Sequence, residues 1–454
     1  MRNRSSRSLF VSAVLGLTVA ATDANADVSI PYTRSTLRNG MTVIFHEDHA
    51  IPMVVVNVSY NVGSRFEQPK RTGFAHLFEH LMFMGTRRVP TKAFDGWMEA
   101  AGGWNNAWTS QDRTDYYDVG PPTALDLLLY LEADRLQDLG PLMNLDKLNA
   151  QREVVRNERR QTSENTPYGK VELRLPELLY PLGHPYHHPV IGSHEDLEAA
   201  TVDDVKQFFA RHYDPANASL VVAGDFDPAK VRPTVEKWFG SITSKGAALD
   251  PGAPGFSDTK TTLDKVVRET IEDDVQLAKV TMAWQSPKHF GPGDAELDLL
   301  ATALSSGKAS RLYKSLVYEQ KLAQSVDASQ ESAVLGSRFT VSAIARPGVS
   351  LDKLEAAIDK ELENAKKPLA DDELVRVKNL VETTFVLKLE SVRERASLLN
   401  MYQAEAKDPG FVAKDLARYR DATKEGIADM AKKTLLPNAR VIVRAVPKKK
   451  AGGK

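Results

Sequence analysis

The sequence predicts an α+β fold of two similar α/β domains, each a mainly antiparallel sheet with helices packed on one side. The chain has 454 residues, 42% of them apolar, which suits a large core and more than one domain. Segments with helical periodicity alternate with short β-rich runs in both halves. A helix that begins at Thr201 and leads to a strand at 219–223 has a counterpart that begins at Thr423 and leads to 440–444. This offset of 222 residues (423 − 201) indicates a duplicated unit.

The N-terminus has the three parts of a secretory signal peptide. The first seven residues carry three arginines, residues 9–21 are apolar but too short to span a bilayer comfortably, and residues 24–26 fit an A-x-A cleavage site. We therefore expect residues 1–26 to be removed and the mature protein to be periplasmic. An arginine-rich mitochondrial presequence is the alternative, but the continuous apolar stretch is not amphipathic.

Local signals predict the elements of a first domain, residues 27–245. An Asn39-Gly40 pair between β-rich flanks predicts a hairpin, and Thr201 followed by acidic residues predicts a helix start. The expected elements are a hairpin at 35–45, a β-rich run at 52–62, helices at 73–85 and 93–101, paired strands at 104–110 and 114–119, helices at 123–139, 145–161 and 201–212, a strand at 218–224 and a helix at 228–239.

A second domain, residues 261–454, is expected after a linker rich in Gly, Pro and Ala at 246–260. It repeats the first domain but lacks the histidine motif described below, so we expect a degenerate copy. Its expected elements, besides the repeated helix and strand, are strands at 278–284 and 337–345 and helices at 295–306, 310–319, 351–365 and 371–389.

Residues 73–85 carry the most informative motif. His76 and His80 are four residues apart, so their imidazoles lie on one helix face about one turn apart, which suits two ligands of one metal ion. Glu79 lies beside the second histidine and is placed to act as a base without being a ligand. The pattern H-x-x-E-H is the inverted form of the common zinc-protease motif. The alternative is a pair of buried, inert histidines, but three polar groups in an apolar helix are costly unless they are paired or metal-bound.

A hydrolytic zinc site needs a third protein ligand from another element. Glu153 and Glu158 on the helix at 145–161 are the first candidates, and a solvated helix face is their alternative fate. The chain has no cysteine, so disulfides and thiolate ligands are excluded. Zinc is the default ion for histidine and carboxylate ligands, with manganese and cobalt as alternatives. Four further histidines form the competing source of the third ligand: His184, His187, His188 and His194.

With these residues in place, the chain resembles the pitrilysin/insulinase family of zinc peptidases, and within it the mitochondrial-processing-peptidase-like bacterial group. The resemblance implies a zinc endopeptidase with one zinc per chain, held by His76, His80 and Glu158, with Glu79 as general base. It also implies that a peptide substrate adds as an extra strand to the segment at 106–109, through Asn106, Ala107, Trp108 and Thr109. The matching segments are 37–41, 73–80, 102–109, 153–158, 184–186, 192, 225 and 310–313.

Two positions depart from the family pattern. Seven positions before Glu158, where the family has a second glutamate, stands Gln151, so Gln151 and Glu153 are the candidates for support around the ligands. The family's substrate-binding arginine and tyrosine fall on Val317 and Gln324. We therefore expect a homologous second subunit to supply that pair in a closed chamber, with a homodimer as the alternative. A non-catalytic scaffold or a zinc-binding subunit without turnover is the alternative function. The formal net charge of −1 gives no support for a nucleic-acid partner.

Overall fold

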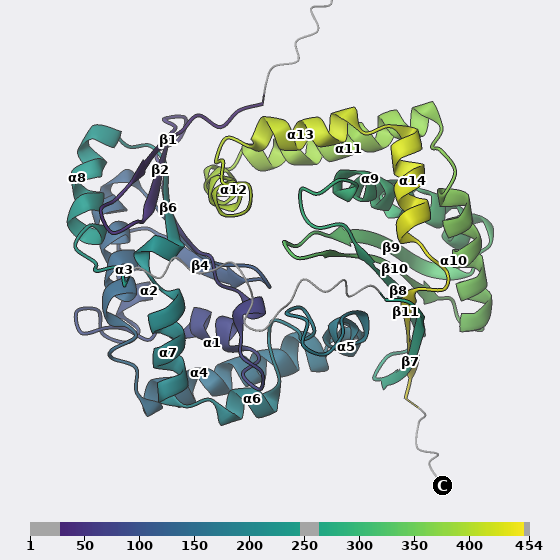
Figure 1. The fold of residues 1–454 in the computed structure, drawn as a ribbon, viewed down its shortest axis with the longest axis horizontal. Helices are drawn as coiled ribbons and strands as arrows, with labels where there is room; N and C mark the ends of the chain where they lie inside the picture. The colour runs from purple at the N-terminus through teal and green to yellow at the C-terminus, as the bar shows by residue number, and fades with distance from the viewer. Residues whose placement is uncertain (1–27, 246–262, 449–454) are drawn as a thin grey trace, which may run out of the picture.

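A computed structural model describes residues 28–245 and 263–448, and its elements form two halves, each built on one sheet (Figure 1). The predicted signal peptide at 1–26 and the predicted linker at 246–260 lie outside the described residues. No helix in the described ranges is long and apolar enough to cross a membrane.

The first sheet has six strands in the order β1-β2-β6-β3-β5-β4. All neighbours are antiparallel except β2 and β6, as the predicted mainly antiparallel sheet requires. The central strands β3 and β6 are buried along their whole length, whereas β4 lies at the edge. The hairpin at Asn39-Gly40 is confirmed, with Gly40 at φ +88°. The strands are β1 Thr33–Thr36, β2 Thr42–Glu47, β3 Val54–Tyr60, β4 Trp104–Thr109, β5 Thr114–Gly120 and β6 Ala218–Gly224.

Eight α-helices are described in the first half, and most pack on one face of this sheet. The paired strands at 104–110 and 114–119 and the helix at 228–239 were predicted correctly, whereas α5 and α6 were not predicted. The helices are α1 Phe74–Leu81, α2 Ala93–Ala100, α3 Leu125–Asp138, α4 Leu145–Glu158, α5 Gly169–Leu179, α6 His194–Ala199, α7 Val202–His212 and α8 Pro228–Phe239, with 3-10 turns at Ser64–Phe66, Pro122–Ala124 and Pro215–Asn217 and a π-helix at Arg159–Glu164.

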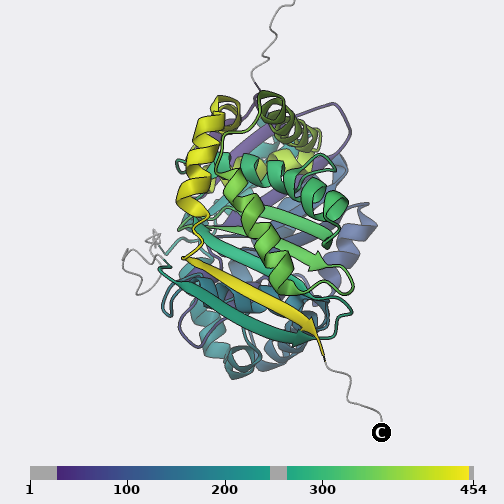
Figure 2. The same cartoon turned by 90° about the vertical axis from the view of Figure 1, so that its right-hand side faces the viewer.

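The second half has five strands in the order β7-β11-β8-β10-β9, with β7 and β11 parallel. Figure 2 faces this half and shows its helices lying over the sheet, with β7 and β11 side by side. The elements are β7 Val266–Asp273, β8 Lys279–Ser286, β9 Ala323–Glu331, β10 Ser337–Ala345, β11 Arg440–Pro447, α9 Asp294–Ser305, α10 Leu351–Ala365, α11 Asp371–Leu389, α12 Val392–Glu405, α13 Val412–Asp421, α14 Lys424–Thr434 and a π-helix at Tyr313–Glu319.

The predicted duplication is visible in the topology. The order β2-β6-β3-β5-β4 in one sheet matches β7-β11-β8-β10-β9 in the other. Thr201 and Thr423 cap the matching helices α7 and α14, each accepting a backbone N–H with its side chain. The helices α1 and α9 also correspond, and each follows a left-handed glycine, Gly73 at φ +87° and Gly293 at φ +97°.

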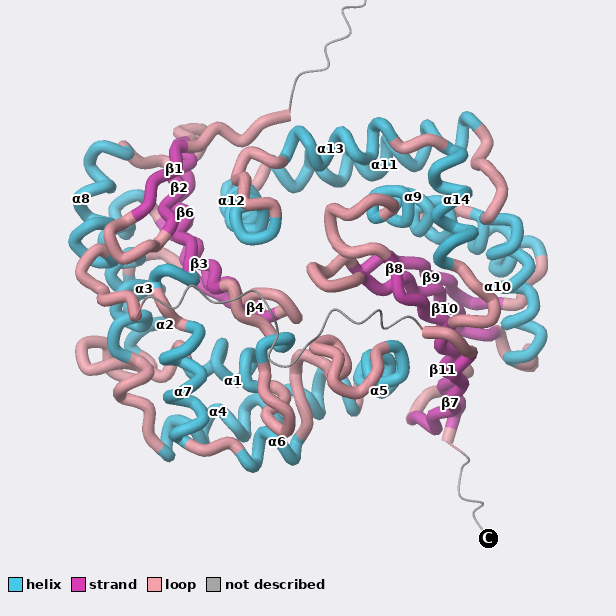
Figure 3. Tube along the Cα trace, viewed as in Figure 1, coloured by secondary structure: helices cyan, strands magenta, loops and turns pink. Residues whose placement is uncertain are grey.

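Each half lends one helix to the sheet of the other half. Helix α12 lies against β3 and β6 of the first sheet, and α5 lies against β8 and β11 of the second (Figure 1). Figure 3 shows both helices next to the sheet of the opposite half. The residues of α12 in the first shared core are Val392, Ala396, Leu399 and Tyr402, and those of α5 in the second are Val171, Leu175 and Leu179.

The residue alternation of β3 explains why its sheet is covered on both faces. Val54, Val56 and Val58 join the core formed with the helices of their own half, whereas Val55 joins the core formed with α12. Because successive side chains of a strand point to opposite faces, the consecutive valines 54–56 require cover on both sides of the sheet.

Candidate metal centre

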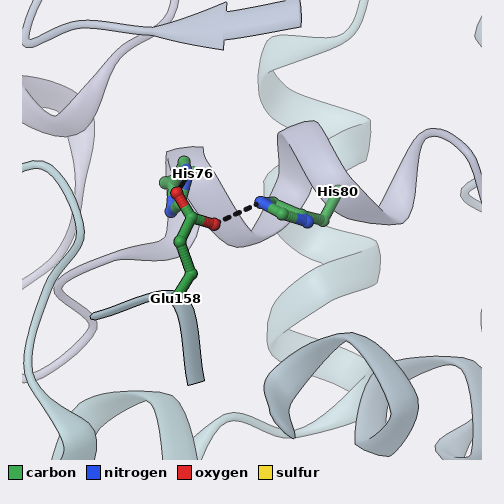
Figure 4. Close-up of side chains that lie close together, drawn as sticks. All are labelled: His76, His80 and Glu158. Atoms are coloured by element: carbon green, nitrogen blue, oxygen red, sulfur yellow. Dashed lines mark ion pairs between the residues drawn. The ribbon is translucent and has the colours of Figure 1, made fainter. Parts of the chain in front are cut away.

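Three side chains from two helices converge on one point, which Figure 4 shows at close range. His76 and His80 come from α1, and Glu158 is the last residue of α4. One ligand atom from each lies within 4.8 Å of the others. The Nε2 atom of His76 is 3.6 Å from Glu158 Oε1, and the Nε2 atom of His80 is 3.1 Å from Glu158 Oε2. Within the described ranges, this is the group of three or more such side chains that could hold a metal ion.

The amphipathic character of α1 aims the histidines away from the core. One face of the helix is buried beneath the first sheet, so the opposite face, with His76, Glu79 and His80, is directed toward α4 and β4. Helix α1 is shorter than the predicted 73–85 and ends at Leu81. The buried residues of the helix are Phe74, Ala75, Leu77, Phe78 and Leu81.

A buried carboxylate holds the beginning of α1. Glu67 accepts hydrogen bonds from the backbone N–H of Gly73 (2.9 Å) and of Ala75 (2.7 Å), two groups that a helix start leaves without internal partners. Burial raises the pKa of Glu67, and these hydrogen bonds oppose that shift. The preceding Thr72 is tied to Asp196 of α6 through its backbone N–H and its hydroxyl. The first turn of the histidine helix is therefore fixed from two sides.

Glu158 lies where α4 changes from an α-helix to a π-helix. The predicted single helix at 145–161 is wrong here, because the segment Arg159–Glu164 has wider turns, with Asn165 N–H bonding to the Arg160 carbonyl. The Thr162 hydroxyl donates to the Glu158 carbonyl (2.8 Å), and no residue of the segment is buried, so no apolar periodicity marks the change. Short π-helical segments inside α-helices are frequent at functional sites.

The donor set fits a divalent ion such as zinc. Burial, reinforced by His80, lowers the pKa of His76 to about 4, so its imidazole is neutral and has a lone pair at neutral pH. The hydrogen bond with His80 lowers the pKa of Glu158, which keeps that carboxylate ionised. The Nε2 atom of His76 is the ring nitrogen that faces Glu158. The other ring nitrogen, Nδ1, is buried without a hydrogen-bond partner in the described structure. Two imidazoles and one carboxylate are a common ligand set of hydrolytic zinc sites.

Glu79 lies beside the three candidate ligands but is not a member of the group that could hold the metal ion. Its Oε2 atom accepts a 2.6 Å hydrogen bond from the Thr109 hydroxyl on β4. Burial raises the pKa of Glu79, and the Thr109 hydrogen bond opposes that shift. A half-buried carboxylate with a raised pKa next to a metal-ligating cluster is suited to accept a proton.

The predicted supporting residues do not reach the ligands. Gln151 donates to the sulfur of Met84 (2.8 Å), and Glu153 is exposed and pairs with Arg156 (2.8 Å). Neither of them makes a hydrogen bond to His76, His80 or Glu158 in the described structure. Both lie on α4: Glu153 is rotated away from Glu158 around the helix, whereas Gln151 lies on nearly the same face but two turns earlier, where it meets Met84.

The competing histidines lie elsewhere and are engaged in other contacts. His187 contacts the Tyr180 carbonyl at 2.8 Å, and His194 contacts Glu164 at 2.9 Å. His184 receives the backbone N–H of Tyr186, and His188 lies 3.6 Å from Glu67, behind the beginning of α1. The structure brings none of these histidines to His76 and His80.

The structure also shows where the predicted substrate strand lies and which residues stand at the arginine and tyrosine positions. Asn106, Ala107, Trp108 and Thr109 lie on β4, the edge strand of the first sheet. Val317 is 8% exposed and packs in the core of the second half. Gln324 is exposed on β9. Sequence reasoning missed Glu67 and the contact of Thr109 with Glu79, because a lone glutamate and a strand threonine carry no periodic signal.

Comparison with known proteins identifies relatives along nearly the whole described chain. The family profile described as Insulinase (Peptidase family M16) matches residues 42–184, and that described as Peptidase M16 inactive domain matches 199–381. The chain is 31% identical over 401 residues to a Helicobacter pylori protein named Zinc protease PqqE, covering 87% of this chain and 88% of that relative.

Two further similarities extend this picture. An Arabidopsis thaliana protein named probable mitochondrial-processing peptidase subunit beta is 26% identical over 387 residues, covering 81% of this chain and 69% of that relative. The crystal structure of a protease from Helicobacter pylori superposes with a TM-score of 0.86 at 28% identity, covering 92% of this chain and 100% of that one.

Proposed function

Because the chain belongs to the insulinase family of peptidases (M16), we propose that it is a zinc-dependent endopeptidase that hydrolyses peptides or unfolded segments. The observation that carries the proposal is the convergence of His76, His80 and Glu158 within 4.8 Å, with the Glu79 carboxylate beside them. A scaffold without chemistry has no need of all four residues in this arrangement.

The three ligands and the base divide the work between them. The Nε2 atoms of His76 and His80 and the Glu158 carboxylate would hold the ion. Bound zinc supplies Lewis-acid chemistry, which polarises a carbonyl and lowers the pKa of water toward ~7. Glu79 accepts the proton of the attacking water and returns it to the leaving amine. The raised pKa of Glu79 brings its proton affinity closer to that of a base working near neutral pH.

The edge strand β4 supports the way in which a substrate would be held. An edge strand offers unpaired backbone N–H and C=O groups to a further strand, and β4 ends at Thr109, whose side chain contacts Glu79. An extended peptide added along Asn106, Ala107 and Trp108 would therefore pass beside the metal ligands. Recognition through backbone groups suits peptides and unfolded segments more than folded proteins.

We propose further that a homologous second subunit completes the site. Val317 is buried in the core, so the position where the family carries its arginine presents no polar group to a substrate. Gln324 replaces the tyrosine position. The Arabidopsis relative is named as one subunit of a processing peptidase, which agrees with a paired assembly. A homodimer with altered substrate contacts is the alternative. Residues 1–26 support export to the periplasm as the place of action.

Hydrolysis of a quenched fluorescent peptide by the mature chain tests the proposal. The chain is assayed alone and with its candidate partner subunit, with zinc content measured on the same preparation and Glu79→Gln as the control. Activity that requires the partner and is lost in Glu79→Gln is expected. Full activity of the chain alone would refute the need for a different subunit. Bound zinc without hydrolysis in either case would favour a zinc-binding subunit without turnover.

A further inference from the structure

The side chains of β4 that face the helices have fixed partners. Asn105 donates to Asp95 of α2 (3.1 Å), Ala107 packs against the core of the first half, and Thr109 donates to Glu79 of α1 (2.6 Å). These three residues are two positions apart, so they share one face of the strand, and the pleat directs the Thr109 hydroxyl toward the histidine helix α1. The contact with Glu79 therefore follows from strand geometry.

A neighbouring threonine restricts where the single hydroxyl hydrogen of Thr109 can go. Thr114 pairs with Thr109 across β4 and β5 and is fully buried, and its own hydroxyl donates to the Val62 carbonyl at 2.8 Å. Its oxygen is 3.4 Å from the Thr109 hydroxyl, whereas Glu79 Oε2 is 2.6 Å away. The shorter, charge-assisted contact takes the hydrogen.

We infer that Thr109 is the positioning residue of the Glu79 base, an inference that rests on the proposed peptidase function. The terminal torsion of a glutamate side chain is broad, so rotamer preference alone does not fix the plane of the carboxylate. The Thr109 hydroxyl engages Oε2, and none of the described residues donates a hydrogen bond to Oε1. Thr109 therefore fixes the carboxylate with Oε1 available for the proton.

This contact also joins substrate binding to the base. Thr109 is the last residue of the strand along which the peptide is proposed to add, and its side chain holds Glu79. The strand proposed to bind the peptide therefore also holds the base on α1 in place, through the Thr109 side chain. Because peptide pairing uses backbone groups, removal of the Thr109 hydroxyl should change the chemical step and leave peptide binding unchanged.

The test compares Thr109→Val with Thr109→Ser. Valine has the shape of threonine and keeps the strand propensity but lacks the hydroxyl, whereas serine retains it. We expect Thr109→Val to lower kcat about 10- to 100-fold, a part of the ~10²–10⁴ that a positioned base contributes. We expect KM to change by less than about twofold where chemistry is slower than substrate release, because the peptide is proposed to pair with backbone groups. Zinc content should stay the same, because the hydroxyl donates to Glu79 and not to a metal ligand. Thr109→Ser should recover kcat to within about threefold.

Thr91→Val is the matched control, because it removes a threonine hydroxyl that donates to the Met84 carbonyl outside the site. It should leave kcat unchanged. A Thr109→Val enzyme with wild-type kcat would overturn the inference, and so would a loss of zinc together with kcat, or a loss that serine does not restore. Absence of hydrolysis by the wild-type chain, alone and with its partner subunit, would instead refute the proposed function and the inference with it.

Discussion

The replacement Asn400→Leu probes the helix that the second half lends to the first sheet. Asn400 on α12 is fully buried, and its Nδ2 atom donates to the Asn57 carbonyl (3.0 Å) and to Asn57 Oδ1 (2.7 Å). Its Oδ1 atom accepts the Ser219 hydroxyl at 2.7 Å. Leucine has a similar volume, so the loss is mainly that of hydrogen bonds. It leaves the Ser219 hydroxyl and Asn57 Oδ1 without this partner, at about 1–3 kcal/mol for each buried group.

The expected fall in the free energy of unfolding is therefore about 4 kcal/mol, the middle of the sum for two such groups. Urea unfolding followed by far-UV circular dichroism, which reports both halves, measures it. The double variant Ser219→Ala with Asn400→Leu should regain about 1–3 kcal/mol of the free energy of unfolding, because the unpaired Ser219 hydroxyl is then removed. An Asn400→Leu protein as stable as wild type, or a double variant no more stable than the single one, would refute the reasoning.

Three further predictions concern the metal site and the core around it. Glu158→Gln should lower bound zinc from about one ion per chain to a small fraction, since hydrolytic sites use three protein ligands; full zinc occupancy by elemental analysis would contradict the assigned ligand. Glu67→Gln should weaken zinc binding about tenfold in a chelator competition, because one backbone N–H of α1 loses its acceptor; the control Asp415→Asn removes a buried carboxylate of the second half and should not alter it. Burial lowers the pKa of His212 from 6.5 to about 4, so its stabilising contribution is present above pH 6.5 and is lost as the pH falls toward 4. His212→Phe should therefore reduce the loss of unfolding free energy over that range by about 3 kcal/mol, and an unchanged pH dependence of urea unfolding would argue against it.

Elements with their own local signals were predicted well. Helices α8 and α10 have the predicted bounds, because Asp227 and Ser350 cap their starts and each has several buried apolar residues on one side. Helix α11 also has the predicted bounds, although Ala370 provides no side-chain cap and Val377 is its one buried residue.

Strands β7 and β9 were not predicted. Both are edge strands rich in polar residues, so neither contains a long apolar run that would mark a buried strand. Helix α5 was missed because it contains Pro176 and has no capping side chain, and α12 because its buried face mixes apolar residues with Asn400. That each helix packs on the sheet of the other half is shown by the tertiary structure.

The candidate site divides in the same way. His76, Glu79 and His80 follow from helical spacing alone, since they are neighbours on one turn. Glu158 lies 78 residues after His80, so spacing gave two candidates on one helix, and the family resemblance selected the one that the structure places beside the histidines. The contacts of Glu67 with α1 and of Thr109 with Glu79 depend on how a loop and an edge strand pack around the helix, which only the tertiary structure shows.

The exchange of α5 and α12 between the halves changes the meaning of the covalent connection between them. Each helix belongs to one half by sequence and to the other half by packing, so the halves are held together at two separate places. The connection through residues 246–262 then mainly supplies effective concentration, a role that noncovalent association at sufficient protein concentration can replace. Residues 27–245 and 263–454, produced as two polypeptides, should assemble as a 1:1 complex. One half could then be isotope-labelled or altered while the other remains unchanged.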